Sequence, residues 1–195
     1  MSLHTLALES KPIDVALSKS GNRLAVLSDR DLTVYALDLN KRPIPKPSLL
    51  WRSDAVKDHS PRHITFLGED QMFVLTDSWD EEESSLWRSQ GDMLLPQGPI
   101  MEAESTSLLL SSVDQETLYT QFQSGALHQV VIDETTSDLP PQTSLVNKFP
   151  SFAPEVQVIN IEGQVRILSV ESYQQELTIT DVGVWFDEER SAIRQ

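Results

Sequence analysis

The sequence predicts an all-β protein, organised as a partial β-propeller of about four blades, each an antiparallel sheet. A unit of apolar runs separated by short polar turns occurs four times, and the units begin at residues 13, 63, 107 and 155. Their spacings of 50, 44 and 48 residues fit a propeller blade, which takes about 40 to 50 residues for four strands. A β-sandwich also has short strands and turns, but it would not repeat a whole multi-strand unit at one period. Long amphipathic helical stretches are absent from the sequence, which argues against a helical solenoid.

The first unit shows the strand pattern most clearly. Ile13, Val15 and Leu17 alternate with other residues, as one buried face of a strand requires. The following turn, Ser-Lys-Ser-Gly-Asn at 18–22, supplies residues that tolerate the positive φ of a hairpin. Strands are expected at 12–17, 23–27 and 32–36.

The other three units repeat this order of apolar runs and turns. Their turns contain Gly, Asp, Glu and Ser, which favour turn conformations. The expected runs lie at 63–67, 71–75 and 85–88 in the second unit, at 107–110, 117–121 and 126–132 in the third, and at 155–159, 164–170 and 176–180 in the fourth.

Proline-rich stretches separate the units, at 40–48, 96–99 and 138–141. Proline cannot donate a hydrogen bond to a neighbouring strand, so a central strand is excluded there and blade-to-blade connections are predicted. The expected organisation is one partial propeller over 1–180, with blades near 13–50, 63–100, 107–150 and 155–180, followed by an irregular or weakly helical tail over 181–195.

The charge balance argues against nucleic-acid binding. The chain carries a formal net charge of -15, and its 15 Lys and Arg residues are scattered. Affinity for a phosphate backbone comes largely from clustered cations that release counterions. No direct nucleic-acid contact and no docking on anionic membranes are therefore expected.

Cysteine is absent from the chain, which excludes disulfides, thiolate nucleophiles and Cys-based zinc sites. The sequence shows no signal-peptide pattern, no apolar run of about 18 residues and no Asn-x-Ser/Thr acceptor. These features predict a soluble intracellular protein.

Residue types that can bind metals or partners occur in three groups: an acidic stretch, the histidines and the tryptophans. The acidic stretch 77–83 holds five carboxylates, but its spacing does not match an EF-hand. A solvated loop between strands explains it, and contact with a partner stays open as a second role. His59 and His63 are four apart with Pro61 between them, so they form no helical zinc motif, and ordinary surface or strand histidines are expected. The other two histidines are His4 and His128, for which the same is expected. For the four tryptophans, packing between blades is favoured over a binding platform; they are Trp51, Trp79, Trp87 and Trp185.

No nucleophile elbow and no glycine-rich phosphate loop occurs in the sequence. Two carboxylates that meet in space could still carry out glycoside chemistry, but nothing in the sequence selects a pair. We therefore predict no catalytic, cofactor-binding or metal-binding residue, no cofactor, no small-molecule substrate and no enzymatic activity.

A ring of four blades is open, since such folds usually close with about seven. Each open end leaves unpaired backbone groups and apolar side chains. Either the chain is a fragment of a longer one or a partner completes it, and the sequence favours the fragment.

Several segments, taken in order, carry a family resemblance. The run 12–17, continuing into 24–28 and 32–35, resembles the second WD40-type propeller of the largest Elongator subunit. Later segments that are similar to this family in the same order are 66–74, 118–127 and 150–154. The resemblance covers roughly 12–170, and from about Asp181 the chain departs from the family.

The resemblance implies a non-catalytic WD40-like scaffold of the Elongator complex, which modifies the wobble uridine of certain tRNAs. The implied partners are other Elongator subunits, and the implied location is the cytoplasm, with the nucleus as a second location. Two alternatives remain open: an unrelated WD40-like adaptor that binds short peptides in trafficking or ubiquitin pathways, and a small β-rich hydrolase.

Overall fold

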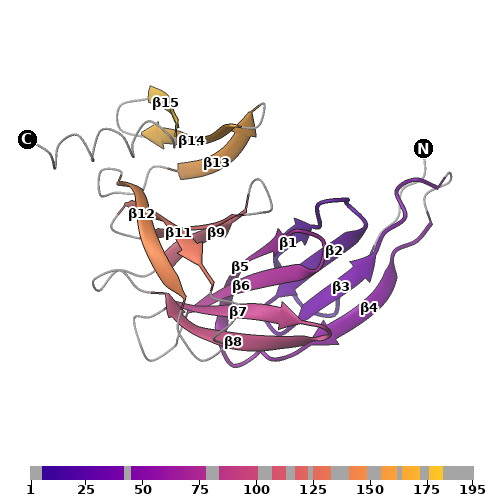
Figure 1. Ribbon diagram of the computed structural model, residues 1–195. Coiled ribbons are helices and arrows are strands. Elements are labelled where there is room, and N and C mark those ends of the chain that lie inside the picture. Colours follow the sequence, from indigo (N-terminus) through magenta and orange to yellow (C-terminus); the bar gives the residue numbers. More distant parts are fainter. Residues whose placement is uncertain are drawn as a thin grey trace, which may run out of the picture.

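The computed structural model describes residues 6–41, 45–77, 84–100, 107–112, 117–122, 125–132, 141–148, 155–161, 164–171 and 176–181. Within these ranges every regular element is a β-strand, and the strands form four separate antiparallel sheets (Figure 1). In each sheet the strands pair in chain order, as in the blades of a propeller. The predicted all-β class and the predicted antiparallel blades are confirmed.

We number the sheets as blades 1 to 4. Blade 1 comprises β1 (Pro12–Leu17), β2 (Arg23–Ser28), β3 (Leu32–Ala36) and β4 (Ser48–Ser53). Blade 2 comprises β5 (Ser60–Leu67), β6 (Gln71–Asp77), β7 (Ser84–Gln90) and β8 (Met93–Ile100). Blade 3 comprises β9 (Ser107–Ser111), β10 (Leu118–Phe122), β11 (Ala126–Val131) and β12 (Gln142–Lys148). In blade 4 the described strands are β13 (Glu155–Ile161), β14 (Gln164–Glu171) and β15 (Glu176–Asp181).

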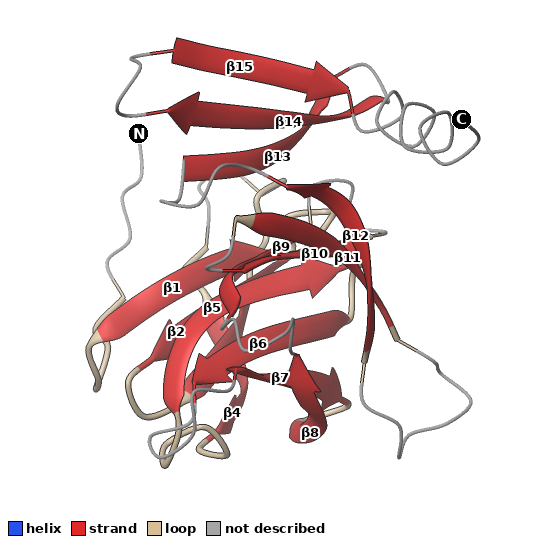
Figure 2. Ribbon diagram, turned by 90° about the vertical axis from the view of Figure 1, so that its left-hand side faces the viewer, coloured by secondary structure: helices blue, strands red, loops and turns tan. Residues whose placement is uncertain are grey.

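The first strands of successive blades lie side by side. β1 contacts β5, and β5 contacts β9, so blades 1, 2 and 3 stack through their first strands (Figure 2). The hairpin predicted at 18–22 is present, and Gly21 has the expected positive φ of 72°. The division into a propeller and a tail stays a prediction, because residues 182–195 lie outside the described ranges.

The outermost strands were not predicted from the sequence. The prediction that 96–99 lies in a connection between blades is wrong, because Pro96, Gly98 and Pro99 are part of β8. β8 is the edge strand of blade 2 and pairs only with β7. Proline is tolerated on an edge strand, because no neighbouring strand on the outer side needs a hydrogen bond from the missing N–H.

Two apolar clusters fill the spaces between blades. The cluster between blades 1 and 2 contains Ala25, Leu27, Leu32 and Val34 of blade 1 and Ile64, Phe66, Met72, Val74, Trp87 and Leu94 of blade 2. The cluster between blades 2 and 3 contains Phe73, Leu75, Leu86, Ile100, Leu118, Phe122 and Val130. Alternate residues of β6 belong to different clusters. The continuous apolar run at 72–75 therefore marks a strand that is buried on both faces.

One sequence expectation about blade 1 is wrong. Ile13, Val15 and Leu17 were expected to form a buried face of β1, but all three side chains are exposed. Asp14 and Ala16 occupy the other face of β1, which lies toward blade 2. The alternation of side chains between the two faces of β1 was correctly predicted. The sequence does not reveal which of these two faces packs against a neighbouring blade.

Asp14 links the first strands of blades 1 and 2. Its carboxylate accepts hydrogen bonds from the amides of Val15 (2.8 Å) and Ile64 (3.0 Å), and Nδ1 of His63 lies 3.4 Å from it. Burial raises the pKa of Asp14, but the hydrogen bonds from His63 and the two amides, with the charge of His63, outweigh burial and lower this pKa.

The Asp14 carboxyl predicts an acid-dependent loss of stability. A lowered pKa stabilises the folded state at pH values above the unfolded pKa of about 3.9, and this contribution is lost as the pH falls through the lower folded pKa. Asp14→Asn should therefore reduce the free energy of unfolding between about pH 4 and pH 6 and have a smaller effect near pH 3. Urea unfolding of both proteins across this range measures the difference, and a difference that stays constant down to pH 3 would contradict the assignment.

Candidate interaction site

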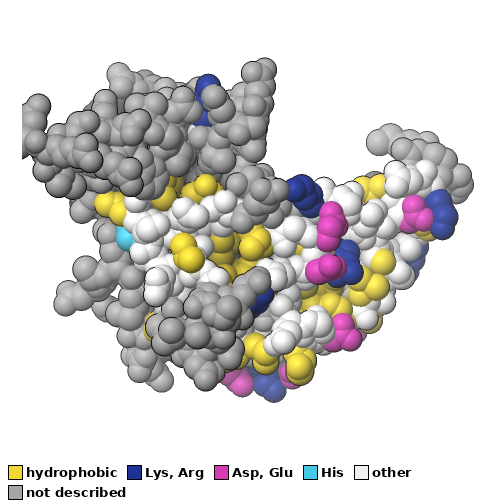
Figure 3. Space-filling model, viewed as in Figure 1, with side chains coloured by type: hydrophobic (Ala, Val, Ile, Leu, Met, Phe, Trp, Pro, Cys, Tyr) yellow, Lys and Arg dark blue, Asp and Glu magenta, His cyan; other side chains and the backbone are white. Residues whose placement is uncertain are grey.

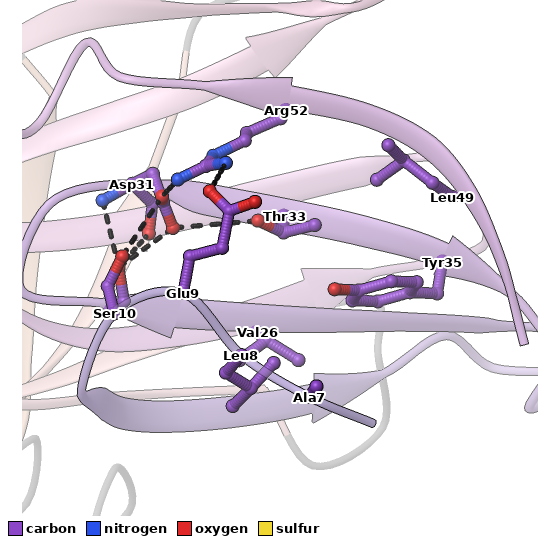
Figure 4. A pocket seen from close by; sticks show the side chains of 11 residues that line it. Ala7, Leu8, Glu9, Ser10, Val26, Asp31, Thr33, Tyr35, Leu49 and Arg52 are labelled. Carbon is purple, nitrogen blue, oxygen red and sulfur yellow. Dashed lines mark hydrogen bonds and ion pairs between the residues drawn. The ribbon is translucent and has the colours of Figure 1, made fainter. Parts of the chain in front are cut away.

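The N-terminal segment 6–10 runs across the face of blade 1 that points away from blade 2. Together with β2, β3 and β4 it lines a cavity of about 120 Å³ (Figure 4). At one end of the cavity lie Leu8, Val26, Tyr35 and Leu49, and at the other end lies a cluster of polar side chains. We call residues 6–10 the N-terminal strap.

The turn between β2 and β3 positions the central residue of the polar cluster, Asp31. The Ser28 amide donates to the Asp31 carbonyl at 2.8 Å, which closes the turn. The Ser28 hydroxyl accepts hydrogen bonds from the amides of Arg30 (3.2 Å) and Asp31 (3.0 Å). Such serine-to-backbone bonds favour a tight turn, so the sequence Ser-Asp-Arg-Asp folds locally into this shape.

The Asp31 side chain is almost fully buried, with 7% of it exposed. Its carboxylate accepts hydrogen bonds from the hydroxyls of Ser28 (2.8 Å), Ser10 (3.3 Å) and Thr33 (3.5 Å). It also pairs with the guanidinium of Arg52. A buried carboxylate needs such partners because removal from water disfavours its charge.

Arg52 of β4 joins the strap to the sheet. Its guanidinium lies between Asp31 and Glu9, and the bond to Glu9 of the strap is 2.5 Å long (Figure 4). Two hydrogen bonds raise the pKa of Arg52 above its ordinary value: the bond to Glu9 has the larger effect, and the bond to Asp31 follows. The backbone adds one more link, because the Asp29 amide donates to the Lys11 carbonyl at 3.2 Å.

This arrangement is a structural clamp. Glu9 and Asp31 are two carboxylates at one cavity, but both are engaged by the same guanidinium. The cavity of about 120 Å³ is also small compared with ligand pockets, which typically measure about 300 to 1,000 Å³. The geometry therefore favours attachment of the strap over hydrolysis.

Blade 2 contains a second buried polar contact. The indole Nε1 of Trp87 donates to the Thr76 hydroxyl at 2.9 Å, and the His59 ring meets the Trp87 ring edge-on, with centroids 4.8 Å apart. Trp87 also belongs to the cluster between blades 1 and 2, as expected for packing between blades. The link between these three residues was not predicted from the sequence. The sequence pattern that could have indicated this contact is a histidine just before β5, a threonine near the end of β6 and a tryptophan in β7.

The remaining candidate residues are placed separately. His63 pairs with Asp14, His128 is buried edge-on against Phe122, and Trp51 packs at the edge of the first apolar cluster. Of the acidic stretch 77–83, Asp77 pairs with Arg62 and accepts a hydrogen bond from Ser84 at 3.2 Å. His4, Trp79, Trp185 and residues 78–83 lie outside the described ranges.

Among the residues whose positions are described, no three His, Asp or Glu side chains gather as metal ligands would. The described part of the chain also contains no helix long and apolar enough to cross a membrane.

Comparison with known proteins identifies the fold and a family. A family model described as the ELP1 N-terminal second beta-propeller matches residues 1–184. No curated protein shows significant sequence similarity to the chain.

Among solved structures, Sqt1 of Saccharomyces cerevisiae is 12% identical to this chain, with a TM-score of 0.53. The match covers 89% of this chain and 45% of that protein. A protein of unknown function from Desulfotomaculum acetoxidans is 13% identical with a TM-score of 0.51, and 90% of this chain covers 57% of it. The chain thus spans about half the length of these propeller-like structures.

Proposed function

The chain belongs to the family of the ELP1 N-terminal second beta-propeller, and we propose on this basis that it acts as a non-catalytic scaffold in the Elongator complex. The observation that carries the proposal is the family match over residues 1–184 of the 195-residue chain. The pathway it would serve is modification of the wobble uridine of tRNA, with the chemistry located in a different subunit. The proposed location is the cytoplasm and also the nucleus.

The use of the buried polar side chains supports a scaffold. Asp31, Thr76 and Trp87 carry the groups that a catalytic site could use, yet their described hydrogen bonds join strands of the same blade or attach the strap. A general base or nucleophile must instead face a substrate at hydrogen-bonding distance. The described polar clusters therefore favour a structural role and contact with protein partners.

The net charge of -15 supports protein partners over direct contact with tRNA, because an acidic surface repels the phosphate backbone. In this proposal the chain reaches the tRNA pathway only through other subunits. Its partner contacts would be made by loops and blade faces.

Affinity capture tests the proposed assembly. The tagged chain, expressed in cells, should retain other Elongator subunits when the captured proteins are identified by mass spectrometry. Phe73→Ala is a matched control, because loss of a fully buried side chain between blades 2 and 3 should unfold the binding surface and reduce capture.

Two outcomes would contradict the proposal. Capture of peptide-binding trafficking or ubiquitin proteins without Elongator subunits would favour the unrelated adaptor. Binding of the purified chain to tRNA at physiological salt would contradict the expected lack of direct contact.

A further inference from the structure

Blades 2 and 3 leave a cavity between them that is separate from the one under the N-terminal strap. Its volume is about 220 Å³, and its lining residues come from β5, β6 and β7 on one side and from β10 and β11 on the other. Phe73, Leu118 and Val130 line it, are at most 5% exposed and belong to the apolar cluster between the two blades. Val131 also lines it and is 49% exposed. This cavity, which we call the blade 2–3 cavity, therefore extends from the apolar cluster to the surface.

Polar groups join the apolar wall of this cavity. The described lining residues include one charged side chain, Arg88 of β7, and two side-chain amides, Gln71 and Gln129. Arg88 lies directly opposite Phe73 in the β6–β7 ladder, and directly opposed residues of antiparallel strands point to the same side of a sheet. Phe73 packs toward blade 3, so Arg88 belongs to that face as well. A guanidinium beside apolar side chains suits a ligand that combines a carboxylate with a hydrocarbon group.

The size of the blade 2–3 cavity limits what it can bind. Pockets for small-molecule ligands typically measure about 300 to 1,000 Å³, and this cavity of about 220 Å³ is smaller. It reaches the surface at Val131, so one or two side chains of a protein segment can enter it. Figure 3 shows hydrophobic side chains at the described surface in several places, including the region where blades 2 and 3 meet. A peptide therefore fits this cavity better than a free small molecule does.

The N-terminal strap shows how this chain holds such a segment. Leu8 of the strap lies beside Val26 at the apolar end of its own cavity, and the next residue, Glu9, pairs with Arg52 at 2.5 Å (Figure 4). An aliphatic residue followed by a glutamate is thus held by an apolar wall and a guanidinium from the sheet. The blade 2–3 cavity has the same two components, and it shares no lining residue with the cavity under the strap.

We propose that the blade 2–3 cavity binds a short segment of a protein partner in which an aliphatic residue adjoins an aspartate or glutamate. The aliphatic side chain packs against Phe73, Leu118 and Val130, and the carboxylate pairs with the guanidinium of Arg88. This inference deepens the scaffold role, and it rests on that proposed function for the partner being a protein. It adds the chemistry of the segment that the partner must present.

Charge limits the expected affinity. The net charge of -15 repels an acidic segment at long range, so the attraction to Arg88 acts only at contact. One aliphatic side chain and one charged pair make few contacts, and we expect a dissociation constant of about 10 to 500 µM. A basic segment is attracted by the net charge but meets the like charge of Arg88 in the cavity. Selective binding of the acidic segment therefore distinguishes this site from non-specific attraction.

Fluorescence anisotropy with a synthetic peptide tests the proposal. The probe is the strap sequence at 6–11, Leu-Ala-Leu-Glu-Ser-Lys, labelled at its lysine and titrated with the purified chain. Arg88→Gln should weaken binding at least about tenfold, because the carboxylate loses its charged partner. Arg30→Gln is the matched control, since it removes the same charge at an exposed position in the β2–β3 turn, and it should leave the affinity unchanged.

Two further variants identify the site. A peptide with glutamine or lysine in place of its glutamate should bind the natural chain at least about tenfold more weakly, and the glutamine peptide should bind Arg88→Gln as the original peptide does. Arg52→Gln should leave the affinity unchanged. If Arg52→Gln weakens binding and Arg88→Gln does not, the peptide has replaced the strap on blade 1 and the proposal is wrong.

A labelling experiment on chains that keep Arg88 separates loss of binding from loss of folding. The natural sequence has no cysteine, so Val131→Cys and Met93→Cys each introduce a single thiol at an exposed position. Saturating peptide should slow maleimide labelling at least about fivefold at position 131 and leave it unchanged at position 93. Absence of binding up to about 2 mM peptide, or equal labelling rates at position 131 with and without peptide, would overturn the proposal. Neither result bears on membership of the Elongator complex, which the affinity capture tests separately.

Discussion

Phe73→Ala should lower the free energy of unfolding by about 3 to 5 kcal/mol, the typical result of truncating a buried phenylalanine. Phe73 is fully buried at the centre of β6 and packs in the cluster between blades 2 and 3. The neighbouring strands on both sides of β6 restrict its movement, so the cavity cannot close easily. Against a total stability of about 5 to 15 kcal/mol, such a loss removes at least about a fifth of the free energy of unfolding.

Urea unfolding monitored by circular dichroism measures the Phe73→Ala effect. Met93→Ala is the control, because its exposed side chain should change stability by no more than about 0.5 kcal/mol. A loss below about 1 kcal/mol for Phe73→Ala would mean that blades 2 and 3 do not pack through β6 as the structure describes.

The repeating architecture could be predicted because each blade is a local structure. The apolar run at 72–75 and the alternation at 13–17 depend on neighbouring residues only, and both lie in strands. The outer strand β8 was missed because Pro96 and Pro99 are compatible with an edge but not with a central strand. Whether a strand is at an edge depends on tertiary packing, which the local sequence does not encode.

The polar clamp could not be predicted for a related reason. Asp31 meets Ser10, Ser28 and Arg52, which come from the strap, β2 and β4. No short motif contains all four residues, and the separation from Asp31 to Arg52 is 21 positions. The orientation of the Ile13 row was missed in the same way, since only the neighbouring blade decides which row is covered.

The clamp and the exposed apolar row of Ile13, Val15 and Leu17 lie on the same side of blade 1. The strap is attached by Glu9 and Ser10, next to the row that stays exposed. A loosened strap would expose Val26 and Tyr35 as well, and the apolar surface would be larger and less specific.

Asp31→Ala should lower the free energy of unfolding by about 1 to 3 kcal/mol, because buried hydroxyl donors lose their acceptor. The substitution removes the acceptor for Ser10, Ser28 and Thr33 and leaves the Arg52 guanidinium without its buried partner. Arg52 is 42% exposed and keeps its bond to Glu9, so the cost comes mainly from the buried hydroxyls that lose their acceptor. Asp31→Asn should cost less, since the amide oxygen can still accept from Ser28.

Hydrogen exchange of the Asp29 amide distinguishes release of the strap from general destabilisation. This amide donates to the carbonyl of Lys11, directly after the strap, so its exchange reports whether the strap stays in place. In Asp31→Ala the Asp29 amide should exchange faster even in conditions where amides of β6 keep their protection. If both sets of amides lose protection together, Asp31 supports the whole sheet instead of holding the strap, and the clamp assigned to Glu9, Arg52 and Asp31 is wrong.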